Sequence, residues 1–562
     1  MKKNILIIFF TIVCLINSAA APKYEVRAVW LTTIGGLDWP HSYAHDGLGI
    51  NNQQQELCNI LDKYVEAGFN TVLFQTRVRG TAAYPSSLEP WEGAFSGVPG
   101  MSPGYDVLKF VIDECHKRGL KLHAWIVTIP LGKWNDVGCE NLRRAYPGIV
   151  KKIGDEGFMN PESGNTAIYL ANLCSEVVRG YDVDGIHLDY IRYPETWGKI
   201  KDRNRARNYI SNIVKTIHDR IKPIKPWIVM SCSPVGKYAD TKRARSGGWN
   251  ARDAVCQDAA LWMKEGWMDM IFPMMYFRGK NFYPFVMDWK ERASGKVVVP
   301  GLGIYFMHPQ EKNWSLMDIT REMNVCRQQG LGICFFRSDF FTSNLKGLYD
   351  YTKNTYSTDL SVPPAISWMS DKRPMPPLQL GFVKSGNGKT VLKWMSNGTE
   401  KASDFQYNVY GSVSPVVDVN VGDNILMSNY RESSVEFPDI QYLRWVAVTS
   451  VDRYGNESAP AVIRLDQSAQ IEDRDEVKAF RTDMLVCDGR FLFLGDCELG
   501  KSQVVEIHSI EGVALTARFV RRQGMQYLVD VSLLHGGHYK AYVVSKKGDK
   551  HLLGRFYKGF NH

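Results

Sequence analysis

The segment Val183–Pro194, with the sequence VDGIHLDYIRYP, carries the first candidate for chemistry. It is predicted to be a buried strand, and side chains alternate between the two faces of a strand. Ile186 and Leu188 then share an apolar face. His187 and Asp189 share the opposite face. In a parallel barrel, a carboxylate at the C-terminal end of a strand lies where catalytic groups are found. Asp189 is therefore the first candidate catalytic residue, and the alternative is a structural role in the strand-to-loop turn.

Hydrolysis of a glycosidic bond is a chemistry that suits this carboxylate, and it normally needs two carboxyl groups. Asp189 would be the nucleophile or a charge stabiliser, and Asp258 is the first choice for its partner. Asp258 begins the helix after the fifth expected strand, and such a helix starts at the C-terminal face of a barrel. The alternative is a helix N-terminal residue stabilised by the dipole. Further loop acids on this face are Glu89, Glu195 and Asp339.

The same alternation brings aromatic and basic side chains to the barrel mouth. Val72 and Phe74 are expected to face outward, so Gln75 and Arg77 point inward. The mouth thus gathers Arg77, Trp125, Arg192 and Tyr276 around Asp189, although several of these could equally fill the barrel core. Aromatic rings stack on the apolar faces of sugars, and Arg binds hydroxyl, carboxylate or acetamido oxygens. These four residues are therefore predicted to bind substrate.

Metal and nucleotide chemistry have little support in the sequence. His123 and His187 lie deeper in their strands and are expected to be hydrogen-bonded core residues. His41 and His45 share one loop, but their spacing fits no ligand motif, and no His-Glu-x-x-His occurs. No glycine-rich nucleotide loop and no Gly-x-Ser-x-Gly elbow occurs. We expect no metal site and no cofactor.

The elements that must position these residues alternate between strand and helix over residues 24–356. Eight strand-like segments are Glu25–Thr33, Asn70–Arg77, Leu120–Thr128, Val183–Pro194, Trp227–Ser233, Met268–Tyr276, Lys296–Tyr305 and Gly332–Arg337. Such an alternation predicts an α/β fold, a (β/α)8 TIM barrel. The loops after the second, third, fifth and sixth strands are long and lie on one face, so a deep cleft is expected there.

The rest of the chain is predicted to form two small all-β sandwich domains. Residues 357–377 contain five prolines and are expected to be an extended linker. Short alternating strands over residues 378–466, and again over residues 475–562, are typical of β-sandwiches.

The N-terminus predicts export. Lys2 and Lys3 precede the apolar run Ile5–Ile16 and then small residues, which is the pattern of a signal peptide over residues 1–21. No other apolar run reaches the roughly 18 residues of a transmembrane helix, so we expect a soluble mature protein. The net charge of +9 is modest and favours an anionic polymer such as cell wall. It lacks the basic stripe of a nucleic-acid binder, so no nucleic-acid partner is expected.

Four segments, taken together, resemble the glycosyl-hydrolase-like family 10: EVRAVWLTT, YDVLKFVIDECHKRGLKLHAW, DGIHLDYIRYP and QDAALWMKEGWMDMIFPMMY. The resemblance spans about residues 25–356 and implies a TIM barrel, glycosidase activity and an extracytoplasmic role. Relatives are associated with cleaving the glycan strands of peptidoglycan. Asp189, Tyr193 and Pro194 fall on the central motif of the family, which adds Tyr193 to the expected substrate-binding residues. Asp258 and Trp262 fall on its Asp-x-x-x-Trp pattern.

The chain departs from the family pattern at two places that bear on the substrate. Many relatives carry a second Asp directly after the first, where this chain has Tyr190. Relatives also commonly have Pro-Gln before the tyrosine of the sixth strand, where this chain has Pro273-Met274-Met275-Tyr276.

The β-domains have resemblances of their own. Trp394 and the segment VAVTSVDRYGNESAP resemble a fibronectin type III domain. The final segment resembles the C-terminal β-sandwich of secreted Bacteroidetes proteins. These resemblances imply secretion to the periplasm or cell surface of a Gram-negative bacterium, with surface association through the β-domains.

The sequence therefore predicts an exported glycoside hydrolase acting on a polysaccharide, with peptidoglycan glycan strands as the leading substrate. A non-catalytic carbohydrate-binding protein and a metal-dependent polysaccharide deacetylase are the alternatives. A second carboxyl group near Asp189 would favour the hydrolase, whereas His and Asp ligands converging near Asp189 would favour the deacetylase.

Overall fold

The computed structural model describes residues 22–244, 249–384, 389–397, 405–436 and 443–465. Further along the chain it describes 485–487, 491–493, 504–509, 514–519, 521–523, 526–531, 534–535, 537–544 and 550–558. The expected signal peptide over residues 1–21 lies outside the described residues. Among the described residues, no helix combines the length and apolar character that a bilayer span needs.

A parallel barrel forms the first part of the chain. Its strand segments are β1 (Arg27–Leu31), β2 (Thr71–Arg77), β3 (Lys121–Val127), β7 (Gly185–Asp189), β8 (Val229–Cys232), β9 (Met270–Ile271), β10 (Val297–Val298), β11 (Gly301–Leu302) and β12 (Ile333–Phe335). They lie in the order β10-β9-β8-β7-β3-β2-β1-β12-β11. β10 and β11 are two halves of one interrupted strand, because β10 pairs with β9 and β11 pairs with β12. The nine segments therefore close into eight strands, which confirms the predicted TIM barrel.

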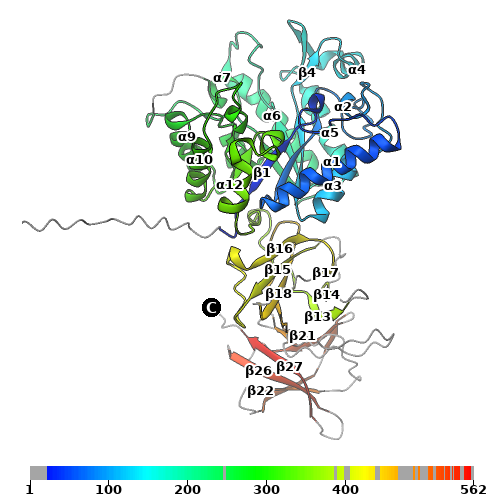
Figure 1. Ribbon diagram of the computed structural model, residues 1–562, viewed down its shortest axis with the longest axis vertical. Coiled ribbons are helices and arrows are strands. Elements are labelled where there is room, and N and C mark those ends of the chain that lie inside the picture. The colour runs from blue at the N-terminus through cyan, green and yellow to red at the C-terminus, as the bar shows by residue number, and fades with distance from the viewer. Residues whose placement is uncertain are drawn as a thin grey trace, which may run out of the picture.

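Helices surround this barrel (Figure 1). They are α1 (Gly47–Glu66), α2 (Gly93–Ser96), α3 (Val107–Lys117), α4 (Val137–Ala145), α5 (Gly164–Gly180), α6 (Arg203–Ile221), α7 (Ala251–Ala254), α8 (Ala259–Lys264), α9 (Tyr283–Glu291), α10 (Leu316–Gln328), α11 (Ser338–Thr342) and α12 (Leu348–Tyr351). α6 shows why such segments form helices. Asp202 caps its N-terminus, and Ile210, Val214 and Ile217 recur on one buried face.

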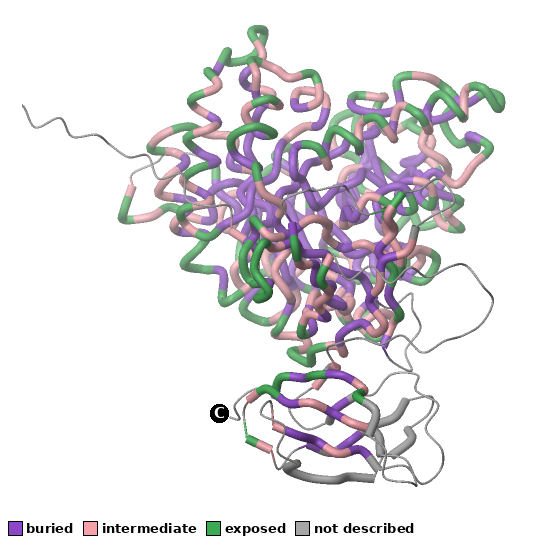
Figure 2. The backbone as a smooth tube through the Cα atoms, turned by 60° about the horizontal axis from the view of Figure 1, so that its bottom comes forward, coloured by how far each residue is buried: buried purple, intermediate pink, exposed green. Residues whose placement is uncertain are grey.

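Two apolar layers hold the barrel together, and Figure 2 shows buried residues concentrated within it. One cluster fills the inside of the barrel and includes Trp30, Leu73, Trp125 and Phe272. A second, larger cluster lies between the outer faces of the strands and the helices. Side chains at consecutive positions of one strand enter different layers, as Leu73 and Phe74 do.

A small antiparallel sheet is inserted after β3. Its strands are β4 (Pro130–Lys133), β5 (Val150–Ile153) and β6 (Glu156–Met159), and β6 lies in the middle. The sequence predicted only a long loop here, because four-residue strands interrupted by turns give no clear alternation. This insertion, followed in Figure 1 through β4 and α4, rises from the end of the barrel opposite the β-domains.

Two β-sandwiches follow the barrel, as predicted. The first packs a sheet of β13 (Leu378–Lys384), β14 (Thr390–Met395) and β17 (Ser434–Glu436) against a sheet of β16 (Ile425–Tyr430), β15 (Gln406–Ser412), β18 (Trp445–Val451) and β19 (Ala461–Arg464). Trp394 lies in its core against Tyr407. The assignment to the fibronectin type III class stays a prediction.

The second β-domain again has two antiparallel sheets. One contains β20 (Val486–Cys487), β21 (Phe491–Phe493), β25 (Gln526–Asp530) and β24 (Arg521–Gln523). The other contains β23 (Ala514–Phe519), β22 (Val504–Ser509), β26 (Gly537–Val544) and β27 (Lys550–Lys558). The first β-domain lies between the barrel and this second one (Figure 1).

The proline-rich stretch 357–377 is extended but packs on the barrel, which corrects the expectation of an unpacked linker. The backbone N–H of Glu25 donates to the carbonyl of Val362, and the N–H of Val362 donates to the carbonyl of Lys23. The indole of Trp368 donates to Asp269. The first β-domain is ion-paired to the same end of the barrel, because Arg431 and Arg453 both contact Asp182, just before β7. These contacts lie at the N-terminal ends of the barrel strands. They therefore do not cover the C-terminal ends of the strands.

Candidate active site

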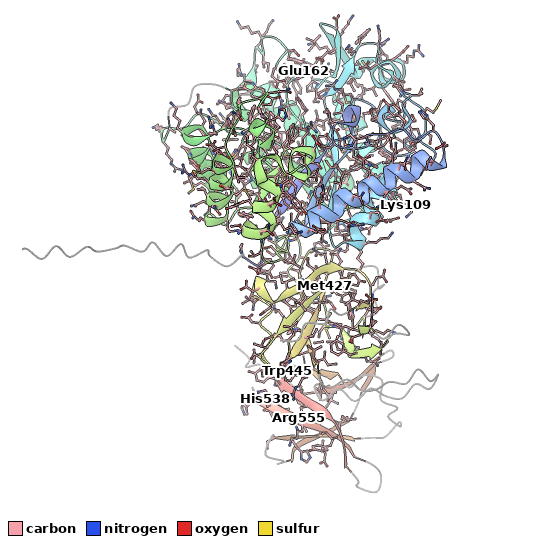
Figure 3. All side chains as sticks on the ribbon, viewed as in Figure 1. Lys109, Glu162, Met427, Trp445, His538 and Arg555 are labelled. Carbon is pink, nitrogen blue, oxygen red and sulfur yellow. The ribbon has the colours of Figure 1, made fainter. Side chains whose placement is uncertain are left out.

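A cavity of about 500 Å³ opens at the C-terminal ends of the barrel strands. Residues from or just after the strands line it, including Thr32, Gln75, Trp125, Asp189, Tyr276 and Phe336. The inserted sheet contributes Pro130, Gly132, Glu156, Gly157 and Phe158. Glu162, which follows this insertion, marks the same end of the barrel in Figure 3, away from the β-domains. The cleft expected from the long loops therefore exists at the face where barrel enzymes bind their substrates.

Asp189 lies in this cavity with three hydrogen-bond donors around its carboxylate. Ser233 Oγ donates to Oδ1 at 2.7 Å, and the backbone N–H of Tyr190 donates to the same oxygen at 2.7 Å. Trp125 Nε1 donates to Oδ2 at 3.1 Å. The side chain is buried and ends β7 on the inward face, as strand alternation predicted. These donors come from β3, β7 and the end of β8, so three strands fix the orientation of the carboxylate.

The environment of Asp189 has opposing effects on its ionisation. Burial raises the pKa of Asp189, while the hydrogen bonds from Ser233, Tyr190 and Trp125 and the charge of Arg192 lower it in part. The net direction is upward. A carboxylate with satisfied acceptors and a raised pKa can attack the anomeric carbon of a sugar, stabilise the positive charge that develops there, or exchange a proton with the glycosidic oxygen.

The turn after Asp189 shapes one side of the cavity. Tyr190 lines the cavity with a φ of 51°, in the left-handed region that costs energy for a non-glycine residue. The Arg192 guanidinium lies 4.4 Å from the centre of the Tyr190 ring and pairs with Glu195, with Nη1 and Oε1 2.9 Å apart. Glu195 lines the cavity, whereas Arg192 lies beneath it. Arg192 therefore acts on the cavity through Tyr190 and Glu195.

An aromatic wall faces this turn. Tyr276 stacks on Phe336, with ring centres 5.3 Å apart, and meets Tyr305 edge to face. Burial, together with the charge of Asp189, holds the pKa of Tyr276 well above its usual range. Tyr276 lines the cavity at the mouth, and its hydroxyl remains protonated at any physiological pH. Its role in substrate binding stays a prediction.

Arg77 does not reach the cavity, which corrects the predicted inward orientation. The pairing of β2 with β3 shifts between Gln75 and Arg77, so Gln75 lies opposite Trp125 and Arg77 lies opposite Ile126. Such a bulge moves all following side chains to the other face. Arg77 is fully buried on the helix side and pairs with Glu89, with Nη2 and Oε1 2.6 Å apart. It also donates to the carbonyl of Thr128 at 2.9 Å.

Two other residues that were predicted to belong to the site make contacts that support the structure around it. Asp258 caps α8 by accepting from the N–H of Leu261 and from the hydroxyl of Tyr238. It is not among the residues that line the cavity. Tyr193 is buried, meets Trp197 edge to face and contacts Glu162 with its hydroxyl, so it supports the cavity rim from behind.

The two core histidines are buried as predicted. Nδ1 of His123 and Nδ1 of His187 each lie 3.0 Å from Ser231 Oγ. Burial lowers the pKa of His123 to about 4, and it lowers that of His187 as well. Both rings are therefore neutral under physiological conditions. Within the described part of the chain, no group of three or more His, Cys, Asp and Glu side chains could hold a metal ion.

Ser233, Glu156 and Arg79 lie at the site in the structure but were not predicted from the sequence. Ser233 was within the fifth predicted strand, and the pair Ser231 and Ser233 marked an inward polar face that could have revealed it. Glu156 lines the cavity from the middle strand of the insertion, and no pattern in the sequence indicated that strand.

A closed (β/α)8 barrel with a buried carboxylate in a cavity at its C-terminal face is an arrangement typical of glycoside hydrolases. The family model Glycosyl hydrolase-like 10 matches residues 25–206 and 199–311. The chain belongs to this family and is a glycoside hydrolase.

Three known proteins illustrate the similarity. Glycosyl hydrolase YngK of Bacillus subtilis (strain 168) is 28% identical over 480 residues, which cover 77% of this chain and 92% of YngK. Glycosyl hydrolase DigH of Escherichia coli (strain K12) is 30% identical over 305 residues, which cover 47% of this chain and 69% of DigH. The solved glycoside hydrolase domain of PgaB (BpsB) from Bordetella bronchiseptica is 12% identical, covers 58% of this chain and 98% of that domain, and superposes with a TM-score of 0.41.

Proposed function

We propose that this glycoside hydrolase cleaves the glycan strands of peptidoglycan, with Asp189 as the reacting carboxylate. The observation that carries the proposal is the environment of Asp189: three donors hold its two oxygens at the floor of a cavity of about 500 Å³. The cavity has aromatic rings on its walls, and such rings stack on the apolar faces of sugars.

In the proposed reaction, Asp189 acts in its ionised form as nucleophile or as stabiliser of the positive charge that develops on the sugar. The donors from Ser233, Trp125 and the backbone of Tyr190 orient the carboxylate before the substrate arrives. Such prior orientation lowers the barrier because little rearrangement is needed in the transition state.

The second carboxyl group is proposed to come from the cavity lining. Glu156 and Glu195 both line the cavity with Asp189. Asp258 stays the sequence-based prediction for this role, although its carboxylate is engaged in capping α8. The partner protonates the leaving oxygen, and the distance between the two carboxyl groups decides the stereochemistry. About 5–5.5 Å gives retention, in which Asp189 forms a glycosyl-enzyme that water then hydrolyses. About 6.5–9.5 Å gives inversion, in which Asp189 takes a proton from the water that attacks the sugar.

We also propose that the protein acts outside the cytoplasm and is held near the cell surface by its β-domains. The pattern of residues 1–21 supports export. The β-domains are joined to the barrel at the end away from the cavity, so they would leave the cavity free to meet a polymer. Fractionation of the source cells tests the location, and recovery of the chain in the cytoplasm contradicts it.

The purified chain, incubated with a panel of glycans, tests the proposed activity. Peptidoglycan glycan strands are expected to gain reducing ends, and the anomer released first reports retention or inversion. Cleavage of neutral polysaccharides instead of these strands contradicts the proposed substrate. Binding without new reducing ends would indicate the non-catalytic alternative, and release of acetate would indicate a deacetylase.

A further inference from the structure

One arginine in the cavity, Arg79, has no ion pair or side-chain hydrogen bond within the described part of the chain. Arg79 lies just after β2, is exposed and lines the cavity. Arg337, the other arginine in the lining, pairs with Asp38. Arg79 is therefore a cation whose guanidinium remains available to a ligand in the cavity.

The backbone around Arg79 is tightly packed. A Cβ atom on Gly138, at the start of α4, would lie 2.5 Å from the carbonyl oxygens of both Arg79 and Gly80. A Cβ atom on Gly132 would lie 3.2 Å from Cδ of Arg79. Gly132 has a φ of 79° and lines the same cavity. These glycines let the loop after β2 lie directly on the insertion, so the stem of Arg79 rests on the cavity wall.

The inserted sheet carries further basic side chains. Trp134 follows β4, and Lys152 Nζ lies 5.3 Å from the centre of its ring. Trp197 comes shortly after the cavity residues Glu195 and Thr196, and Lys151 Nζ lies 4.2 Å from its ring. Trp134 also has the Arg143 guanidinium 4.6 Å from its ring centre. Neither tryptophan lines the cavity, so these cations add positive charge to the insertion without forming part of the cavity.

The carboxylates of the cavity differ in how they are neutralised. Asp189 is satisfied by its three donors, and Glu195 is paired with Arg192. Glu156 is exposed and in no ion pair with a described residue. Its negative charge therefore repels an anionic group that comes close to it. A negatively charged substituent would therefore be directed to Arg79, which can bind both oxygens of a carboxylate.

We propose that the cavity accepts a glycan whose sugar rings carry carboxylate groups, and that Arg79 is the residue that binds one such carboxylate. This inference rests on the proposed function, because it takes the cavity as the glycan site. It adds that recognition depends on the charge of the sugar as well as on its shape.

A matched pair of polymers tests the inference. One is purified peptidoglycan glycan strands freed of peptides, whose sugars carry carboxylates. The other is the same preparation with those carboxylates reduced to alcohols, which leaves the linkages intact. Binding is measured by calorimetry at low salt with the Asp189→Asn variant, so that no cleavage occurs during the titration.

The Asp189→Asn protein is expected to bind the carboxylated strands at least about 10-fold more tightly than the reduced strands, as one charge-assisted contact allows. Adding Arg79→Gln should bring the two affinities within about 3-fold of each other, with binding of the reduced strands unchanged. Arg179→Gln, an exposed arginine near the end of α5, is the control and should keep the full preference.

Two outcomes overturn the inference and can be told apart. Equal binding of both polymers, or a preference that survives Arg79→Gln, removes the role of Arg79 but leaves the glycan site in place. Failure to bind either polymer removes both the inference and the proposed substrate.

Discussion

Trp125 donates its indole N–H to Asp189 over 3.1 Å and so joins β3 to β7 within the cavity. Trp125 also lines the cavity, although its ring belongs to the apolar cluster inside the barrel. A single side chain therefore links the packed interior of the barrel to the carboxylate proposed to react. The packed core holds the Trp125 ring in place, and the hydrogen bond from that ring helps to fix the orientation of Asp189.

Replacing Trp125 with Phe tests this link, because Phe keeps an aromatic ring and loses the indole donor. A hydrogen bond to a charged group contributes about 1.5–3 kcal/mol, so kcat should fall by about 10- to 100-fold. KM should change much less if the ring mainly fills space. The measurement is steady-state kinetics on glycan strands, and an unchanged kcat would show that the indole donor does not matter.

Ser233→Ala is expected to change the pH dependence of activity. The hydrogen bond from Ser233 lowers the pKa of Asp189, so its removal leaves burial less opposed and moves that pKa upward. Activity that needs the ionised carboxylate is lost as the pH falls through this pKa. The acidic limb of the kcat profile should therefore move to higher pH in the variant. A limb that stays in place or moves to lower pH contradicts the assigned ionisation of Asp189.

Three amide substitutions identify the partner of Asp189. Glu156→Gln or Glu195→Gln should lower kcat by at least about 100-fold and remove the alkaline limb of the pH profile, as expected for loss of a general acid. Asp258→Asn should remain close to wild type in activity and stability, because Asn caps a helix about as well as Asp. Loss of activity in Asp258→Asn alone would instead support the sequence-based assignment of Asp258.

Arg77→Met should affect stability rather than substrate binding. Removing one member of a buried ion pair leaves Glu89 with an uncompensated charge and costs about 3–5 kcal/mol. Chemical denaturation should show this loss as a lower midpoint, whereas KM of the folded variant stays unchanged. The double variant with Glu89→Gln should lose less than the sum of the two single losses. A raised KM with normal stability would instead support the sequence-based prediction that Arg77 binds substrate.

The barrel could be predicted from the sequence because each strand is a buried segment next to a helix of clear period. β7 and the inward side chain of Asp189 followed directly from alternation. The inserted sheet could not be predicted, because its strands PLGK, VKKI and EGFM lack the run of buried apolar residues that marks the barrel strands. Glu156 was missed for the same reason.

Other parts of the site depend on geometry that alternation does not contain. The single shift between Gln75 and Arg77 moved Arg77 to the helix side, although Gln75 kept its predicted face. The position of Asp258 depends on the path of the long loop between β8 and α8, and this loop places the start of α8 away from the cavity lining. The alternation along a strand predicts the face on which a side chain lies only as far as the first β-bulge.

The most direct test of the proposed role of Asp189 is the rate of glycan-strand cleavage by Asp189→Asn, measured as new reducing ends from peptidoglycan strands. If Asp189 is the reacting carboxylate, kcat falls by at least about 1,000-fold while the barrel stays folded and the strands still bind. Cleavage at the wild-type rate by this folded variant would contradict the central role of Asp189.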